Sequence, residues 1–443
     1  MGLDPIECDG AEHPGKHRQG SSSISSSQAI GQATEEDGPG HSRSFEQRQR
    51  KEVIMKSVLF RAPVLSKSGY GVHARQVAKW LFSKEEELDL DITVEALNWG
   101  GTGWITDVEA EDGLVGRVLQ ATTNVKPFYD VTIQLQLPNE WNPMLGAFNI
   151  GITAGVETDL CYPGWVDAVN NMNLVIVPSE FTKETFLRSG DVGTPIVVVP
   201  ESFVDEVVTS DKPLDLDLPT KFNFLVFGQV TGNSPETDRK NIPYTLKWLA
   251  ETFANRPDIG VILKTNMMRN TKLDRHASTG IFSQLLMNIV KGPGPRFYLL
   301  HGDMSNEEVV GLYKHPSVKA LVTLTHGEGY GLPILEAAAC GLPVIAPAWS
   351  GHMEFMKHGK FIQVAHEVKE IDPGRVDQTI FRKEAKWAYP IEGDAKHRLA
   401  KFVESSELPR QWAQELKSKL LPLYSFEAVS AIYDNVLTEA LKG

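Results

Sequence analysis

The chain has 443 residues and a formal net charge of −13, with 41% hydrophobic and 23% charged residues. These proportions are ordinary for a soluble globular protein, and the length favours two domains because single cores stop growing at about 250–300 residues. The acidic balance disfavours a general binder of nucleic acid or anionic membranes, and no apolar run in the sequence approaches the roughly 20 residues that span a bilayer.

Residues 1–54 differ in composition from the rest of the chain. They contain a serine-rich run at 21–27 and almost no aromatic residues, so they cannot bury enough apolar surface to fold. We interpret them as a disordered extension that lacks the apolar core of a signal peptide. Met55 resembles a natural start, because a strand is predicted directly after it.

The three cysteines are widely separated in the sequence, at Cys8, Cys161 and Cys340. Their spacing fits neither a disulfide framework nor a cluster of metal ligands. The simplest interpretation is a protein of the reducing cytoplasm.

The first predicted strand, residues 58–63, leads into Ser66-Lys-Ser-Gly-Tyr-Gly-Val-His73 and a helix over 74–82. A glycine turn at the carboxyl end of a first strand is where doubly wound sheets bind ligands. The spacing is Gly-x-Gly without a third glycine, which disfavours a dinucleotide-binding oxidoreductase.

The rest of the first half alternates between strands and helices, which predicts a parallel α/β sheet. A helix is expected over 179–187 with Ser179 as its N-cap. The loop 98–104 holds two tryptophans and three glycines; it can form a platform on which an acceptor sugar stacks, or it can be an ordinary packed loop. The expected strands are 92–96, 130–135, 148–153, 174–177 and 195–199.

An acidic, proline-containing stretch at 210–219 indicates a linker, and a second domain restarts with a strand over 222–229. Further elements of this domain are a helix through residue 254, a strand at 259–264, a strand and turn over 296–303 with the turn at 301–302, a helix over 307–313 and helical periodicity over 395–423 and 426–441.

The most informative stretch is Thr325-His-Gly-Glu-Gly-Tyr-Gly-Leu-Pro-Ile-Leu-Glu336, which follows a β-rich run beginning at Val318. Pro333 suits a first helical position and Gly341 suits the residue after a helix end, so the pattern predicts strand, glycine loop, helix, strand. The free N–H groups at such a helix start can hold a phosphate. Glu328 and Glu336 would frame the anion and bind sugar hydroxyls on either side of it. Glycine-rich turns alone occur throughout α/β proteins, so the glycines leave the phosphate role open.

The complete string resembles the E-x7-E motif of the retaining glycosyltransferases of family 4, with Glu328 and Glu336 as its two glutamates. The resemblance extends more weakly over most of the chain after Met55. It implies the GT-B fold: α/β, with two facing Rossmann-like domains, an interdomain cleft and a C-terminal helix that crosses back. The domains expected are a disordered extension at 1–54, an acceptor-side domain at 55–215, a nucleotide-sugar domain at 216–424 and the returning helix at 425–443.

The resemblance also implies the site, with some departures from the family pattern. The family's Gly-Arg pair is replaced by Gly228-Gln229, so the second cation beside Lys240 is either supplied elsewhere, with Arg239 and Lys264 as candidates, or absent. The family's histidine is absent from the 153–159 stretch, where Glu157 can contact the sugar or acceptor instead, or be a solvated loop carboxylate. The expected catalytic residues are Glu328, Lys240 and Glu157. The expected donor-binding residues are Gly69, Gly71, Arg239, Lys240, Lys264, His301, Gly302, Glu328, Gly329, Tyr330, Gly331, Leu332 and Glu336.

Together with these residues, the resemblance implies a retaining, metal-independent glycosyltransferase that moves a sugar from a UDP- or GDP-sugar to a hydroxyl acceptor, a saccharide or glycoconjugate. No cofactor is expected, because the nucleotide sugar is itself the donor substrate. The alternatives are a phosphorylase or hydrolase on the same fold, a non-catalytic sugar-nucleotide binding protein, and a transferase that decorates modified bases of phage-type DNA. Nucleic acid is therefore expected only as an acceptor.

Overall fold

The computed structural model of the protein describes residues 4–5, 55–266 and 270–442. These residues contain two parallel sheets, each with helices on both faces, and a separate antiparallel strand pair. The prediction of a disordered extension at 1–54 falls outside the described residues except at Asp4–Pro5, which form the short strand β1. The predicted domain boundaries remain predictions.

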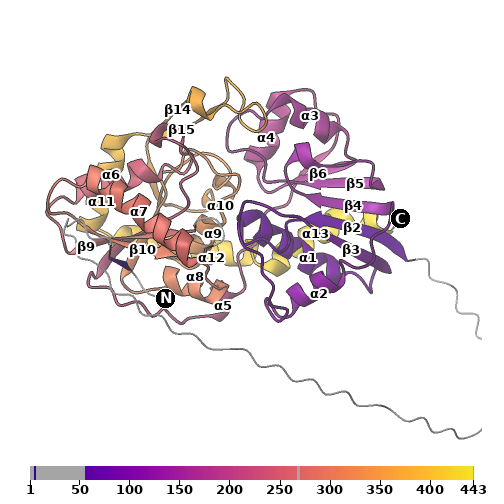
Figure 1. The fold of residues 1–443 in the computed structure, drawn as a ribbon, viewed down its shortest axis with the longest axis horizontal. Coiled ribbons are helices and arrows are strands. Elements are labelled where there is room, and N and C mark those ends of the chain that lie inside the picture. The colour runs from indigo at the N-terminus through magenta and orange to yellow at the C-terminus, as the bar shows by residue number, and fades with distance from the viewer. Residues whose placement is uncertain (1–3, 6–54, 267–269, 443) are drawn as a thin grey trace, which may run out of the picture. The chain divides into compact units, whose positions relative to one another are not determined.

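The first sheet has the strand order β3-β2-β4-β5-β6-β7, with every pair parallel. Its helices cover both faces, because alternate residues of a strand point to opposite sides. Ile176 of β6 packs in the same core as α1 and α2, whereas Val175 and Val177 pack with α3 and α4 (Figure 1). The strands are β2 (Lys56–Ala62), β3 (Leu90–Ala96), β4 (Tyr129–Leu135), β5 (Gly146–Ile152), β6 (Leu174–Val177) and β7 (Ile196–Val198), and the helices are α1 (Gly69–Ser83), α2 (Leu114–Gln120), α3 (Pro163–Asn170) and α4 (Glu180–Ser189). The short helix α5 (Glu206–Thr209) follows β7, and its Val207 packs in the core of the second sheet.

The second sheet has the order β1-β10-β9-β8-β11-β12-β13, parallel except for β1, which pairs antiparallel with β10. Leu225 of β8 packs with α8, α9 and α12, whereas Phe224 and Val226 pack with α6, α7 and α11. The strands are β8 (Phe222–Phe227), β9 (Ile259–Thr265), β10 (Arg296–His301), β11 (Val318–Val322), β12 (Val344–Pro347) and β13 (Ile362–Val364), and the helices are α6 (Ile242–Thr252), α7 (Lys272–Ile289), α8 (Asn306–Tyr313), α9 (Leu332–Ala339), α10 (Met353–Met356), α11 (Glu392–Glu404) and α12 (Glu407–Leu423).

Local sequence explains where the helices begin. Side chains of Ser68, Ser179, Thr271 and Ser305 accept hydrogen bonds from backbone amides in the first turns of α1, α4, α7 and α8, as N-cap residues do. The N-cap at Ser179 agrees with the prediction. Helix α1 begins at Gly69, five residues before the predicted start at Ala74, so Gly69 and Gly71 belong to its first turn.

The last helix returns to the first domain. Helix α13 (Phe426–Lys442) packs its buried face, Val429, Tyr433, Leu437 and Leu441, into the core formed by β2, β4 and α1 (Figure 1). This agrees with the predicted crossing helix. No helix in the described part of the chain is long and apolar enough to cross a membrane.

A pair of antiparallel strands was not predicted. Strands β14 (His366–Glu370) and β15 (Lys386–Pro390) form an antiparallel pair after the second sheet. Trp387 of β15 is fully buried and stacks on the imidazole ring of His326, with ring centroids 5.0 Å apart. The backbone of Lys386 exchanges hydrogen bonds with Asp159 of the first domain. The strand pair therefore packs against the loops that precede Glu328 and follow Glu157.

Candidate active site

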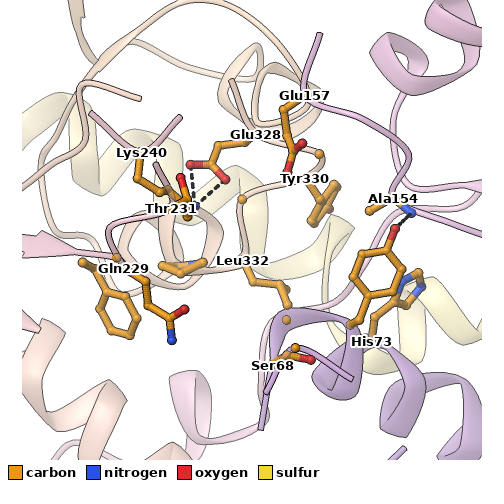
Figure 2. A pocket seen from close by; sticks show the side chains of 18 of the residues that line it. Ser68, His73, Ala154, Glu157, Gln229, Thr231, Lys240, Glu328, Tyr330 and Leu332 are labelled. Carbon is orange, nitrogen blue, oxygen red and sulfur yellow. Dashed lines mark hydrogen bonds and ion pairs between the residues drawn. The ribbon is translucent and has the colours of Figure 1, made fainter. Parts of the chain in front are cut away.

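A cavity of about 430 Å³ is lined by residues of both domains. Its walls come mainly from segments that follow the carboxyl ends of the strands, which is where ligands bind in open parallel sheets. Figure 2 shows Lys240, Glu328 and Glu157 at one side of the site and Ser68 and His73 at another, with Leu332 between them. Predicted site residues that line the cavity are Gly69, Glu157, Arg239, Lys240, Lys264, Glu328, Gly329, Tyr330, Gly331 and Leu332.

The start of α9 forms one wall of the cavity. Gly331 is its N-cap with a φ of +98°, a left-handed conformation that favours glycine, and Pro333 occupies the first turn. Within the described residues, the amide N–H groups of 329 to 332 have no hydrogen-bond acceptor. Four free amides at the positive end of a helix dipole make this wall suited to an anion.

Glu328 lies next to these amides and is held by two cations. The Lys240 ammonium contacts both of its carboxylate oxygens, at 2.7 and 2.6 Å, and Arg239 Nη1 lies 3.3 Å from Oε2. Arg239 also donates to the Gly327 carbonyl at 2.7 Å and pairs with the Glu157 carboxylate at 3.2 Å. The four side chains form one charge cluster that joins Glu157 of the first domain to three residues of the second.

Burial and the neighbouring charges shift the pKa of Glu328 in opposite directions. Burial raises the pKa of its carboxyl, but the adjacent charges of Lys240 and Arg239 outweigh it and lower the pKa to about 2. For Lys240 burial is the larger effect and lowers the pKa, although Glu328 opposes it. Glu328 is therefore a carboxylate across the physiological pH range, and a ligand that approaches the cluster meets a fixed ion network.

The stability of the protein should reflect this shift. The pKa of Glu328 lies below its ordinary value of 4.5 in the folded state, so its ionisation adds stability above about pH 4.5, which is lost as the pH falls toward 2. The contribution is on the order of 3 kcal/mol. In urea unfolding, we expect the difference in stability between wild type and Glu328→Gln to be constant near neutral pH and to shrink below about pH 4. A difference that stays constant in acid would contradict the ion network.

The loop that supplies the cations is organised by a buried aspartate. One oxygen of Asp238 accepts from the Thr231 amide and hydroxyl at 2.7 and 2.8 Å, and the other accepts from the Ile242 amide at the start of α6. Because Asp238 is fully buried, these bonds fix the course of residues 228–241. Arg239 and Lys240 follow it directly and point to Glu328, and the neutral Gln229 also lines the cavity.

Lys264 and the 301–302 turn lie together, at the carboxyl ends of β9 and β10. The Lys264 ammonium is buried and donates to the Gly302 carbonyl at 2.7 Å. Burial lowers its pKa to about 8. His301 is also buried, and its Nε2 atom has no hydrogen-bond partner within the described residues. Lys264 lines the cavity, but His301 and Gly302 are not among its lining residues.

Two further predicted residues do not reach the cavity. Gly71 donates its amide to the Ser68 hydroxyl, and a Cβ at this position would lie 1.9 Å from the Ser66 carbonyl oxygen; the glycine is explained by close packing. Glu336 is buried on α9, where its carboxyl accepts a hydrogen bond from the Tyr313 hydroxyl at 3.3 Å. Burial raises its pKa to about 8. The expectation that Glu336 faces the same crevice as Glu328 is therefore not met in this structure.

The two domains meet closely at Gly327. A Cβ built on this residue would lie 2.2 Å from the Glu157 carbonyl oxygen and 3.0 Å from the Trp349 ring. Gly329 similarly approaches the Ala154 carbonyl, at 2.9 Å. Glycine at both positions lets the motif loop lie against the 153–159 loop, which brings Glu157 to Arg239.

Gly327→Ala should consequently force these loops apart. We expect a loss of at least about 2 kcal/mol of stability, because the methyl group meets backbone that cannot move freely. Thermal unfolding measures the effect. Gly393→Ala is the matched control, since a Cβ on this residue of α11 meets nothing within 4 Å. Equal melting temperatures for the two variants would contradict the tight contact.

Some residues line the cavity although no sequence motif identified them as site residues. Trp99, from the loop with the two tryptophans, lines the cavity and packs on Tyr70 with ring centroids 4.9 Å apart. His73 and Glu201 line it as well. Glu201 follows β7, and its position just after a predicted strand was the only signal available. No three His, Cys, Asp or Glu side chains in the described ranges are grouped closely enough to hold a metal ion.

Comparison with known proteins agrees with this arrangement. Residues 298–372, which include the Glu328 loop and α9, match the family model described as Glycosyl transferases group 1. No curated protein is significantly similar to the chain in sequence.

Solved structures are similar over most of the chain. Sucrose-phosphate synthase from Thermosynechococcus elongatus has a TM-score of 0.55 at 13% identity, covering 87% of this chain and 98% of the other. The Anabaena protein Alr3699/HepE, crystallised with UDP and glucose, has a TM-score of 0.53 at 15% identity, covering 87% and 100%. At this identity the likeness concerns the fold alone. Together with the two parallel sheets and the returning helix, it confirms the predicted GT-B fold.

Proposed function

We propose that the protein is a glycosyltransferase that moves a sugar from a nucleotide-sugar donor to a hydroxyl group of an acceptor. One observation carries the proposal: the free amides at the start of α9 line the same cavity as the Lys240–Glu328–Arg239 cluster. A nucleotide sugar carries a diphosphate between two hydroxyl-rich rings, and this wall offers anion-binding amides beside a carboxylate. The match of residues 298–372 to group 1 glycosyl transferases supports the same class.

The donor would lie with its diphosphate against the amides of 329 to 332. Lys240 and Arg239 would neutralise the β-phosphate side, in place of the family's Arg-Lys pair, because both already converge on Glu328. Lys264, which lines the cavity, would lie toward the nucleobase, with His301 and Gly302 directly behind it. UDP in the related Anabaena structure supports a UDP-sugar donor, and a GDP-sugar remains the alternative.

The chemical problem is departure of the leaving group. As the bond from the sugar C1 to the β-phosphate oxygen breaks, the phosphate gains negative charge and the ring gains oxocarbenium character. Fixed amides and cations positioned where this charge develops are commonly the largest catalytic contribution. The acceptor oxygen would form the new bond to C1 on the face that the phosphate leaves, and its proton would pass to the departing phosphate. The anomeric configuration would then be retained.

Glu328 would bind sugar hydroxyls and stabilise the positive ring. A role as covalent nucleophile fits poorly, because both of its oxygens are engaged by Lys240. Glu157 would orient Arg239 and face the sugar or acceptor from the first domain. Trp99 and Tyr70 offer an aromatic surface for an acceptor such as a saccharide or glycoconjugate.

We further propose that transfer needs no metal ion, since two cations and a helix start already face the diphosphate position. Activity should then be unchanged by a chelator, and a loss restored by a divalent cation would count against this part of the proposal.

A donor panel tests the function. UDP- and GDP-sugars are screened by thermal shift, because a ligand that binds the folded state raises its apparent stability. The best donor is then incubated with and without saccharide acceptors, and the products are analysed by mass spectrometry. Sugar transferred to an acceptor supports the proposal. Release of free sugar or sugar phosphate without an acceptor would indicate a hydrolase or phosphorylase, and binding without turnover would indicate a sensor.

A further inference from the structure

Residues 348–352, the loop between β12 and α10, pack against the motif loop. Gly351 donates its amide to the Glu328 carbonyl at 2.9 Å, and a Cβ built on Gly351 would lie 1.9 Å from the Gly329 carbonyl oxygen. None of the five residues, all of them in the described part of the chain, is among those that line the cavity. The loop therefore contacts the backbone that carries the Glu328 carboxylate, but it does not face a bound ligand.

Ser350 has an unusual backbone conformation within this loop. Its φ is +82°, whereas the other non-glycine residues with positive φ in the described ranges reach at most +66°. A residue with a side chain is strained in this left-handed region. Ser350 is also only 3% exposed. A strained, buried serine at a position that favours glycine indicates that its hydroxyl contributes something that glycine cannot supply.

The Ser350 hydroxyl bonds to the backbone of Glu328. Its Oγ atom accepts a hydrogen bond from the Glu328 amide at 2.9 Å, and the bond is buried. Because Gly351 donates to the carbonyl of the same residue, both the N–H and the C=O group of Glu328 are held by this loop. The next four amides, those of 329 to 332, are the free ones. The anchored part of the motif loop thus ends where the anion-binding wall begins.

The loop that provides the anchor is itself fixed. The His352 side chain is fully buried, and its Nε2 atom lies 2.8 Å from the Pro347 carbonyl oxygen. A carbonyl can only accept, so Nε2 donates and closes residues 347–352 on themselves. Phe355 and Met356 of α10 are fully buried in the core of the second sheet. The anchor therefore rests on the folded core of the second domain.

A bound donor would make this anchor necessary. In the structure, Lys240 and Arg239 hold the Glu328 carboxylate. Under the proposed function both cations face the diphosphate, which weakens their hold on the carboxylate when its position beside the sugar ring matters most. The bonds from Ser350 and Gly351 do not involve the cations, so they remain when the donor binds.

Resting on the proposed function, we infer that Ser350 is a positioning residue, whose hydroxyl fixes the Glu328 backbone so that the carboxylate stays beside the transferred sugar when the donor draws the cations away. Ser350 acts through Glu328 and touches no substrate. Its loss should therefore lower the rate of transfer without weakening the binding of the diphosphate.

Two substitutions separate the hydroxyl from the backbone strain. Ser350→Gly removes the hydroxyl and relieves the left-handed φ, whereas Ser350→Ala removes the hydroxyl and keeps the strain. We expect kcat to fall about 10- to 100-fold in both, because a small misplacement of a reacting group costs about this much. Calorimetry with UDP and GDP should give affinities within about twofold of wild type. In thermal unfolding, the Ala variant should melt below the Gly variant.

Two controls make the same kinds of change elsewhere. Ser305→Ala removes a hydroxyl that accepts from a backbone amide at the start of α8, and Gln378→Gly relieves a positive φ of 56° at an exposed position. Both should keep the wild-type kcat. A loss of kcat in either control as large as that in the Ser350 variants would attribute the effect to stability and overturn the inference.

Hydrogen exchange gives a readout that needs no turnover. The Glu328 amide is buried and bonded to Ser350 Oγ, so it should exchange slowly in wild type and at least about tenfold faster in both Ser350 variants. Residue-resolved exchange over 325–332 measures this. An unchanged rate at Glu328 would show that the hydroxyl does not anchor this residue.

The outcomes separate the two proposals. Wild-type kcat in Ser350→Gly, a loss of kcat confined to Ser350→Ala, or a loss of nucleotide affinity as large as the loss of kcat would overturn the positioning role alone. If Ser350→Ala does not fold, the Gly variant decides through its kcat and its exchange rate. No nucleotide binding and no transfer by wild type would defeat the proposed function itself, while the exchange rates separately decide the anchor.

Discussion

Glu328→Gln is expected to lower kcat about a hundredfold or more while leaving the affinity for the nucleoside diphosphate intact or improved. The loss follows because the amide cannot stabilise the positive ring, and removal of one preorganised charge at a reacting centre commonly costs about 10²–10³ in rate. Affinity should not fall, because Lys240 and Arg239 are released from the carboxylate that engages them now and become free to bind phosphate.

The two parts of this prediction are measured separately, kcat by product formation and affinity by calorimetry with UDP or GDP. Glu415→Gln, an exposed glutamate on α12, serves as the control and should match wild type in both. A Glu328→Gln enzyme with wild-type turnover would remove Glu328 from the chemistry. Lost affinity at wild-type turnover would show that the carboxylate holds the donor and not the transition state.

Unlike Glu328→Gln, Lys240→Met should weaken donor binding. We expect the donor affinity to fall about 10- to 100-fold, in addition to a loss of rate. The ammonium contacts both oxygens of Glu328 and is one of the two charges proposed to face the β-phosphate, and charge-assisted hydrogen bonds are worth about 1.5–3 kcal/mol. Its removal also leaves Arg239 as the main partner of a buried carboxylate, so the pKa of Glu328 should rise.

Calorimetry over a range of pH measures both effects of Lys240→Met. Lys247→Met is the matched control, because Lys247 lies on α6 in the same loop–helix unit but pairs with Glu251 at the surface. Donor affinity in Lys240→Met equal to that of the control would show that the diphosphate binds elsewhere.

The sequence was most informative where residues of the site also follow the local rules for helix ends and strand ends. Pro333 and Gly341 predicted the start and end of the motif helix, and α9 runs from Leu332 to Ala339 with Cys340 as its C-cap. Lys264 was predicted at a strand end and lies there, lining the cavity. These features depend on residues that are neighbours in sequence or on the rule that parallel strands end at one edge.

Other features depend on contacts that no local pattern records. Helical spacing brings Glu336 one turn below Leu332, but the Tyr313 hydroxyl on α8 decides that its carboxyl is held away from the cavity. Gly71 is explained by its distance to the Ser66 carbonyl, which the Gly-x-Gly spacing alone does not reveal. Glu201 is placed at the cavity by its contacts with Tyr330 and His73, which lie more than a hundred residues away in either direction along the chain.

The strand pair β14–β15 illustrates the same limit. Trp387 and Asp159 connect it to the His326 ring and to the 153–159 loop, yet its short strands are separated by an irregular stretch and carry mostly polar residues on β14. Periodicity cannot identify such an element. Its packing nevertheless supports the two loops that bring Glu157 and Glu328 to Arg239.

A crystal structure with bound UDP or GDP, whichever raises the melting temperature more, tests the central claim most directly. The account predicts the diphosphate within hydrogen-bonding distance of the amides of 329 to 332, with Lys240 turned toward it. A nucleotide bound elsewhere, with these amides and the Lys240–Glu328 pair unchanged, would contradict it.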